Sequence, residues 1–219
     1  MKFVSVTNGD AGHQEMRGAA LARRRRAEAM EAARRLGIQA EVLDFHDGEL
    51  LPALEARWEI IRLIREWRAD VVMGPRPNDY HPDHRACGLL VQDAAYMVTV
   101  PAVVPGTAAL RKNPVFLHFE DRFERPNPFR ADVTVAIGDA VEAKRDALDA
   151  HVSQFYEWLP WLDGRLQEVP AGAEARKRWL ADTWPAFVRP TEAFEICEYG
   201  SRELPRAFAG LADHLPDLG

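Results

Sequence analysis

The chain has 219 residues, of which 47% are hydrophobic and 28% are charged, and its formal net charge is −6. This composition excludes a disordered, collagen-like or coiled-coil protein and suits a full-sized α/β domain. The acidic balance argues against a nucleic-acid partner. No apolar run reaches the roughly 18 residues that a membrane span needs. The two cysteines, Cys87 and Cys197, do not form a disulfide framework, so we expect a reduced, cytoplasmic protein.

Strand-like and helix-like patterns alternate along the chain. Short β-branched or apolar runs predict strands, and longer runs with a period near 3.6 residues predict helices. The expected strands are residues 2–7, 41–45, 70–74, 115–119, 133–137 and 194–199. The expected helices are residues 19–36, 54–67, 83–98, 140–158 and 174–184. This order predicts an α/β protein in which helices cover both faces of a mostly parallel sheet.

Two unusually polar loops each follow an expected strand, at residues 8–18 and 75–84. In open α/β sheets, ligands bind outside the carboxyl ends of the strands. We therefore expect these two loops to carry the functional site. Residues 8–12 do not match the G-x-G-x-x-G dinucleotide fingerprint, which weakens the alternative of a nucleotide-binding protein.

The most specific motif is His81-Pro82-Asp83-His84, where an expected helix begins. Pro82 suits the first helical turn, and histidines three residues apart can face the same crevice. Neutral imidazoles are the usual ligands of zinc and related ions. A second histidine that does not bind the metal could stabilise an oxyanion or move a proton. The alternative is that both histidines are surface or capping residues.

Three other features are weaker candidates. His13 lies in the first loop and either reaches the same crevice or is a solvated loop residue. The four arginines at 23–26 predict a solvated helix face, from which one side chain could reach a sugar-like or anionic substrate. Cys87, one turn after His84, fits a small buried thiol better than a fourth ligand. The spacing of His151, in the segment HVSQ, assigns it no role.

Four segments together resemble the PIG-L/LmbE-like family of metal-dependent deacetylases. They are VSVTNGDAGH at 4–13, the R-x-x-E pair Arg25 and Glu28, NDYHPDHR at 78–85, and EAFEICEYG at 192–200. The resemblance covers nearly the whole chain. It implies a single domain over residues 1–219 with a Rossmann-like fold and Zn²⁺, or another divalent metal, at the strand ends. The implied reaction removes an acetyl or other acyl group from an N-acetylglucosamine-type sugar or a related N-acyl compound.

The resemblance also implies roles for individual residues. His84 would be a metal ligand, and His81 would be the histidine that stabilises the tetrahedral intermediate without binding the metal. The expected substrate-binding residues are Arg25, Asp79, Asp10 and His13. The expected partner is a small N-acylated sugar or glycoconjugate, and a homo-oligomer is compatible with the tryptophan content.

The chain departs from the family pattern in one respect. The family carries an A-H-P-D-D motif upstream of the segment that resembles VTNGD, and this chain has no second HPDD. That motif provides the other metal ligands and the general base. We therefore expect an N-terminally incomplete domain, for which two hypotheses compete. Either the chain is part of a longer deacetylase, or it is a catalytically inactive relative that has not retained the metal and binds a sugar or a partner.

Overall fold

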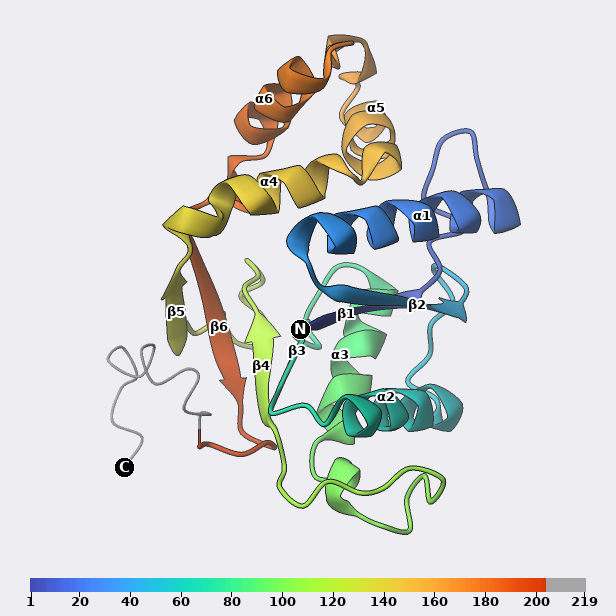
Figure 1. The fold of residues 1–219 in the computed structure, drawn as a ribbon, viewed down its shortest axis with the longest axis vertical. Coiled ribbons are helices and arrows are strands. Elements are labelled where there is room, and N and C mark those ends of the chain that lie inside the picture. The colour runs from blue at the N-terminus through green and yellow to red at the C-terminus, as the bar shows by residue number, and fades with distance from the viewer. Residues whose placement is uncertain (204–219) are drawn as a thin grey trace. The chain divides into compact units, whose positions relative to one another are not determined.

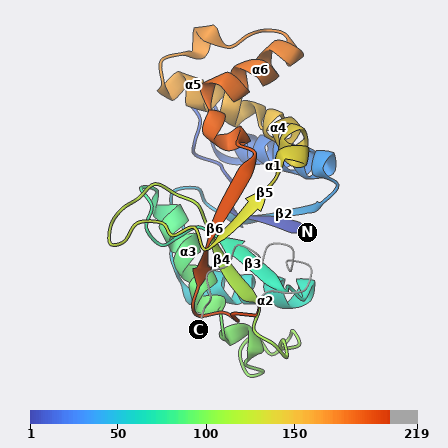
Figure 2. The same ribbon diagram turned by 90° about the vertical axis from the view of Figure 1, so that its left-hand side faces the viewer.

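The computed structural model describes residues 1–203, and Figures 1 and 2 show the course of the chain. The chain forms two compact units. The first contains residues 1–49 and 136–191, and the second contains residues 50–135 and, within the described part of the chain, residues 192–203. None of the described helices is long and apolar enough to cross a membrane.

The first unit begins with a βαβ arrangement. Strands β1 (Lys2–Thr7) and β2 (Gln39–Phe45) pair in parallel, and helix α1 (Gly18–Leu36) connects them. Parallel neighbours require such a crossover. The helix ends at Gly37, whose left-handed conformation (φ 66°) lets its N–H reach the last carbonyls of α1. The first polar loop therefore follows β1, as expected.

The rest of the first unit is helical, but the prediction of one helix over 140–158 was wrong. Helix α4 (Val141–Asp149) ends early, and a π-helical turn, Ser153–Trp158, leads into α5 (Leu159–Leu162). The backbone N–H of Ser153 donates to the Glu28 carboxylate on α1 instead of to a helix carbonyl, which interrupts the regular ladder. Helix α6 (Ala173–Thr183) follows. Figure 1 shows α4 lying beside α1, and Ala32, Ala147 and Ala150 allow this close packing.

The second unit contains a four-stranded sheet with the order β3-β4-β6-β5. Its strands are β3 (Val71–Gly74), β4 (Val115–Phe119), β5 (Val133–Ala136) and β6 (Thr191–Cys197). Strands β3 and β4 are parallel, and β6 is antiparallel to β4. The last strand begins three residues before the expected start at 194 and ends at Cys197. The sheet core is aliphatic and aromatic: Val115, Leu117, Val133, Phe194 and Ile196.

Two helices complete the second unit, α2 (Leu54–Trp67) and α3 (Pro82–Ala94). Helix α3 ends four residues earlier than expected and is followed by a short 3₁₀ turn, Met97–Thr99. A Cβ on Gly88 would lie 2.8 Å from the Pro75 carbonyl oxygen, so α3 and the start of the second polar loop are in direct backbone contact. The absence of a side chain at Gly88 therefore positions this loop.

Candidate functional site

The HPDH segment starts α3 in the second unit. His81 is the N-cap: its backbone is extended, and its Nδ1 accepts a hydrogen bond from the Asp83 N–H at 3.2 Å. Pro82 occupies the first turn, where a missing N–H costs nothing. The capping alternative is thus confirmed for His81. Because Nδ1 accepts, the proton of the neutral ring lies on Nε2, which remains available as a donor.

Asp79 links the two histidines. Its Oδ1 accepts the backbone N–H of His81 at 2.8 Å and lies 3.1 Å from Nδ1 of His84. Arg85 fixes the same loop by donating to the carbonyls of Asp79 and Tyr80. A carboxylate beside Nδ1 favours a proton on that nitrogen, so Nε2 of His84 presents its lone pair outward.

The two histidines therefore have opposite hydrogen-bonding character. Their rings lie 4.8 Å apart, and the His84 side chain is 51% exposed. The Nε2 donor of His81 suits a carbonyl oxygen that gains negative charge. The Nε2 acceptor of His84 suits a divalent ion or a proton. The roles implied by the resemblance stay predictions, and the contacts of the two Nδ1 atoms give them a physical basis.

A zinc centre needs more than His84. A catalytic zinc ion takes about three protein ligands. Within residues 1–203, no group of three or more His, Cys, Asp or Glu side chains is placed to hold a metal. Partial burial raises the pKa of the Cys87 thiol to about 11, so Cys87 stays protonated and is no thiolate ligand. The described residues therefore do not fit a complete metal site.

Buried polar groups hold the base of this loop. His118 on β4 donates from Nδ1 to the Pro75 carbonyl at 3.1 Å and accepts from Gln92 at Nε2 at 3.2 Å. Burial lowers the pKa of His118, which keeps its ring neutral. Arg76 is 2% exposed and donates to Asp121. These contacts make His118 a structural residue.

The loop after β1, in the first unit, is closed by its own polar groups. The Asp10 carboxylate accepts the Asp47 N–H at 3.0 Å and lies 2.7 Å from Nδ1 of His46. The hydrogen bond with His46 holds the pKa of Asp10 below its usual value, and it raises the pKa of His46. Asn8 is 6% exposed and accepts the Asp10 N–H. Both carboxylate oxygens of Asp10 are therefore engaged within this unit.

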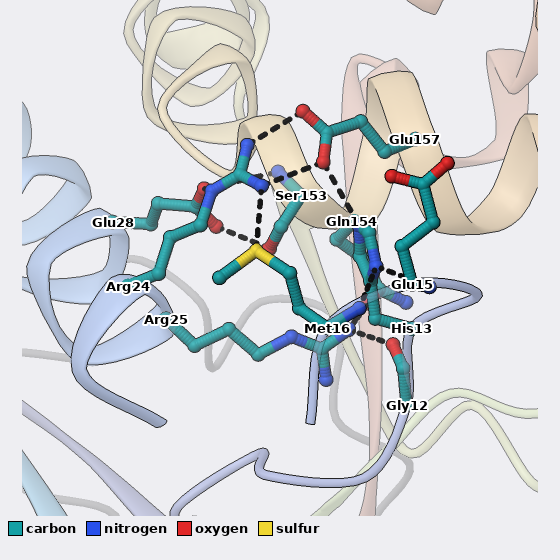
Figure 3. Close-up of polar contacts among 10 residues, drawn as sticks. All are labelled: Gly12, His13, Glu15, Met16, Arg24, Arg25, Glu28, Ser153, Gln154 and Glu157. Atoms are coloured by element: carbon teal, nitrogen blue, oxygen red, sulfur yellow. Dashed lines mark hydrogen bonds and ion pairs between the residues drawn. The ribbon is translucent and has the colours of Figure 1, made fainter. Parts of the chain in front are cut away.

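His13 anchors the same loop. Its side chain is 2% exposed, so the alternative of a solvated loop residue was wrong. Its Nδ1 accepts the N–H groups of Glu15 and Met16, both at 3.1 Å, and its Nε2 donates to Glu157 at 2.8 Å (Figure 3). Both ring nitrogens are thus bonded to the protein.

The four arginines at 23–26 point in different directions. Arg23 and Arg26 are exposed, as expected of a solvated helix face. Arg24 forms a bidentate pair with Glu157, with N···O distances of 2.7 and 2.5 Å (Figure 3). Arg25 turns into the unit, as the sequence allowed for one member of the run.

Arg25 lines a cavity of about 250 Å³ in the first unit. Its Nη2 donates to Gln154 Oε1 at 2.9 Å and to the Gly12 carbonyl. The other lining residues are mostly polar and include Thr7, Asn8, Glu28, Asp47, His151 and Ser153. Burial lowers the pKa of His151, so this cavity combines a cation, carboxylates, hydroxyls and a neutral imidazole. Pockets for larger ligands hold roughly 300–1,000 Å³, so this one suits a single small polar group.

Sequence reasoning missed most of the residues that surround Arg25. Glu28 entered only through the R-x-x-E pair, and Ser153, Gln154 and Glu157 entered no prediction as site residues. A signal existed on α1, because Glu28 lies four residues after Arg24 and three after Arg25. That spacing places the three on one helix face.

Comparison with known proteins shows which family the chain resembles. Residues 1–95 match the PIG-L family model, described as GlcNAc-PI de-N-acetylase. A diacetylchitobiose deacetylase of Thermococcus kodakarensis is 32% identical in an alignment of 173 residues that covers 73% of this chain and 63% of that protein. The chain is thus similar to PIG-L proteins, most clearly over residues 1–95. This confirms the resemblance, and the chain spans 63% of the length of that relative.

Two solved structures share the fold. The N,N′-diacetylchitobiose deacetylase of Pyrococcus horikoshii is 26% identical, with a TM-score of 0.66 over 90% of this chain and 73% of its own. The 4-carboxy-2-hydroxymuconate hydratase of Pseudomonas putida, 24% identical, has a TM-score of 0.67 over 90% of this chain and 83% of its own. The second similarity concerns the fold alone. Together with the observed elements, these structures confirm the expected α/β class.

Proposed function

We propose that this chain supplies part or all of a metal-dependent hydrolase that removes an acetyl or other acyl group from an N-acetylglucosamine-type sugar or a related N-acyl compound. Similarity to the PIG-L family and the deacetylase relatives support the reaction class. The observation that carries the proposal is the contrast at Nδ1: that of His81 accepts the Asp83 N–H, whereas that of His84 lies beside the Asp79 carboxylate. These contacts favour a donor at Nε2 of His81 and an acceptor at Nε2 of His84.

His81 acts on the amide carbonyl in this proposal. When water attacks the acetamide carbon, negative charge develops on the carbonyl oxygen, and the Nε2–H of His81 donates to it. The cap bond from Asp83 fixes the ring and its tautomer before the reaction begins. The donor therefore needs no reorganisation as the charge forms.

His84 is the proposed ligand for Zn²⁺ or another divalent metal. Asp79 orients its ring and favours the proton on Nδ1, the arrangement usual for metal-bound histidines. The other ligands are not assigned to residues of this chain. The metal requirement rests on His84 and on the resemblance to the family.

The proposed partner is a small N-acylated sugar or glycoconjugate. In the first unit, Arg25 and its cavity offer donors and acceptors to sugar hydroxyl or acyl groups. Asp10 and His13 are proposed to shape the loop beside it, and Asp79 supports the histidine pair. A single domain, a cytoplasmic location and a homo-oligomer stay predictions.

The test follows acetate released from N,N′-diacetylchitobiose, with added Zn²⁺ and with a chelator, together with the metal content. We expect His81→Ala to keep the metal and to lower kcat by about 10²–10³-fold, the usual effect of losing one oxyanion donor. His84→Ala should lose the metal and the activity. Asp93→Asn, which changes an exposed carboxylate on the same helix, is the matched control.

Two results would count against the proposal. Full metal content and full activity in His84→Ala would show that this histidine is not a ligand. Binding of the sugar by the unaltered protein without acetate release, with or without metal, would favour the inactive, sugar-binding alternative.

A further inference from the structure

The π-helical turn Ser153–Trp158 holds one face of α1 through three polar side chains. Ser153 Oγ donates to Glu28 at 2.6 Å, Gln154 accepts from Arg25 at 2.9 Å, and Glu157 pairs with Arg24 (Figure 3). A π turn contains an extra residue relative to an α-helix, and such turns are frequent at functional sites.

The contact with Gln154 leaves part of the Arg25 guanidinium unused. Only Nη2 is hydrogen-bonded within residues 1–203, to Gln154 and to the Gly12 carbonyl. Nε has no hydrogen-bond partner among these residues, but it is buried and a ligand oxygen cannot reach it. Nη1 makes no hydrogen bond among these residues, and its ion-pair partner Asp47 is 3.9 Å away. Nη1 is therefore the donor of Arg25 that remains for a ligand in the cavity.

The two loop glycines, Gly9 and Gly12, leave room for the Arg25 side chain. A Cβ on Gly9 would lie 2.7 Å from Cδ of Arg25, and one on Gly12 would lie 3.2 Å from Nη1. Gly9 also has a φ of 72°, a conformation that other residues rarely adopt. The loop backbone thus encloses Arg25 on one side while Gln154 holds it on the other.

We propose that Gln154 is a positioning residue that fixes the Arg25 guanidinium in the cavity, with Nη1 left to bind a carbonyl or hydroxyl oxygen of the ligand. The choice of an N-acylated sugar as that ligand rests on the proposed function. Gln154 acts through Arg25 and does not itself need to contact the sugar.

Arginine labelling tests the positioning independently of any catalysis. Phenylglyoxal modifies accessible guanidinium groups, and peptide mass spectrometry compares Arg25 with the exposed Arg26 next to it. We expect Gln154→Ala to raise labelling of Arg25 relative to Arg26 roughly fivefold, the scale of one lost hydrogen bond. Gln154→Glu keeps an acceptor oxygen and should restore the protection. Gln167→Ala, which removes an exposed amide elsewhere in this unit, should change nothing.

Ligand binding separates positioning from a merely structural role. The dissociation constant of N,N′-diacetylchitobiose, measured by calorimetry, should rise roughly fivefold in Gln154→Ala and return toward the original value in Gln154→Glu. Where acetate release is measurable, KM should rise while kcat holds, because a ground-state contact is lost.

Unchanged Arg25 labelling in Gln154→Ala would overturn the proposal, as would increased labelling with an unchanged dissociation constant. Equal losses in Gln154→Ala and Gln154→Glu would also overturn it, because they would indicate damage to the π turn. If the unaltered protein neither binds nor deacetylates the sugar, the proposed function fails, and the labelling result alone then decides whether Gln154 positions Arg25.

Discussion

The buried side chain of Arg65, on α2, holds together the segment that follows α3. It is 2% exposed and donates to six backbone carbonyls at 2.6–3.1 Å: those of Met97, Val98, Val100, Val103, Val104 and Thr107. This segment has positive φ angles at Tyr96 (63°) and Val104 (48°), which are unfavourable for residues other than glycine. We predict that Arg65→Met, which keeps the length but no donor, destabilises the second unit.

The expected loss of stability is the difference between the hydrogen bonds that Arg65→Met removes and the desolvation cost that it also removes. Six contacts to one cation, at about 1 kcal/mol net each, would contribute about 6 kcal/mol, although five N–H groups must share six carbonyls. Replacing a buried cation recovers several kcal/mol of desolvation, because no ion pair within residues 1–203 compensates it. We expect the free energy of unfolding to fall by about 3 kcal/mol, in the range for a broken buried network.

Urea denaturation followed by circular dichroism measures this change, and hydrogen exchange localises it to residues 97–110. The control is Arg62→Met on the same helix, which removes the partly exposed ion pairs with Glu59 and Glu66 and should cost less than about 1 kcal/mol. A loss below 1 kcal/mol for Arg65→Met, with unchanged exchange in residues 97–110, would refute the reasoning.

Four further predictions concern single contacts. Asp10 has a lowered pKa and His46 a raised one, so the ion pair between them stabilises the fold from below pH 3.8 to above pH 6.5. A double-mutant cycle should detect their interaction energy near about pH 5.5 and no longer detect it by about pH 9. Burial lowers the pKa of His118, so stability should fall as the pH drops below 6.5, and His118→Asn should flatten that dependence in denaturation curves. With its pKa raised to about 11 from 9.0, Cys87 should react with iodoacetamide at about pH 8 on the order of 100-fold more slowly in the folded protein than in urea, and equal rates would contradict its burial. Gly88→Ala should lower the free energy of unfolding by about 1–3 kcal/mol through contact with the Pro75 carbonyl, whereas Gly106→Ala meets nothing within 4 Å and should be neutral.

The sequence by itself determined the class of the fold and the resemblance to the PIG-L family. Strand-like and helix-like periods placed β1, α1 and α2 to within a few residues, because each depends on local propensity and on one apolar face. The HPDH motif located the start of α3 for the same reason: a proline at the first helical turn is a local signal. The resemblance followed from motifs whose residues lie close together in the chain.

Only the tertiary structure decided which polar groups meet. Arg25 and Gln154 are 129 positions apart, and the interruption after α4 exists because the N–H of Ser153 bonds to Glu28 on another helix. Periodicity over 140–158 favoured one continuous helix, since a local pattern contains no information about a distant carboxylate. The sequence pattern could not predict the burial of His13 against Glu157 for the same reason. Long-range hydrogen bonds between side chains override local preference, and they form only after the helices have packed.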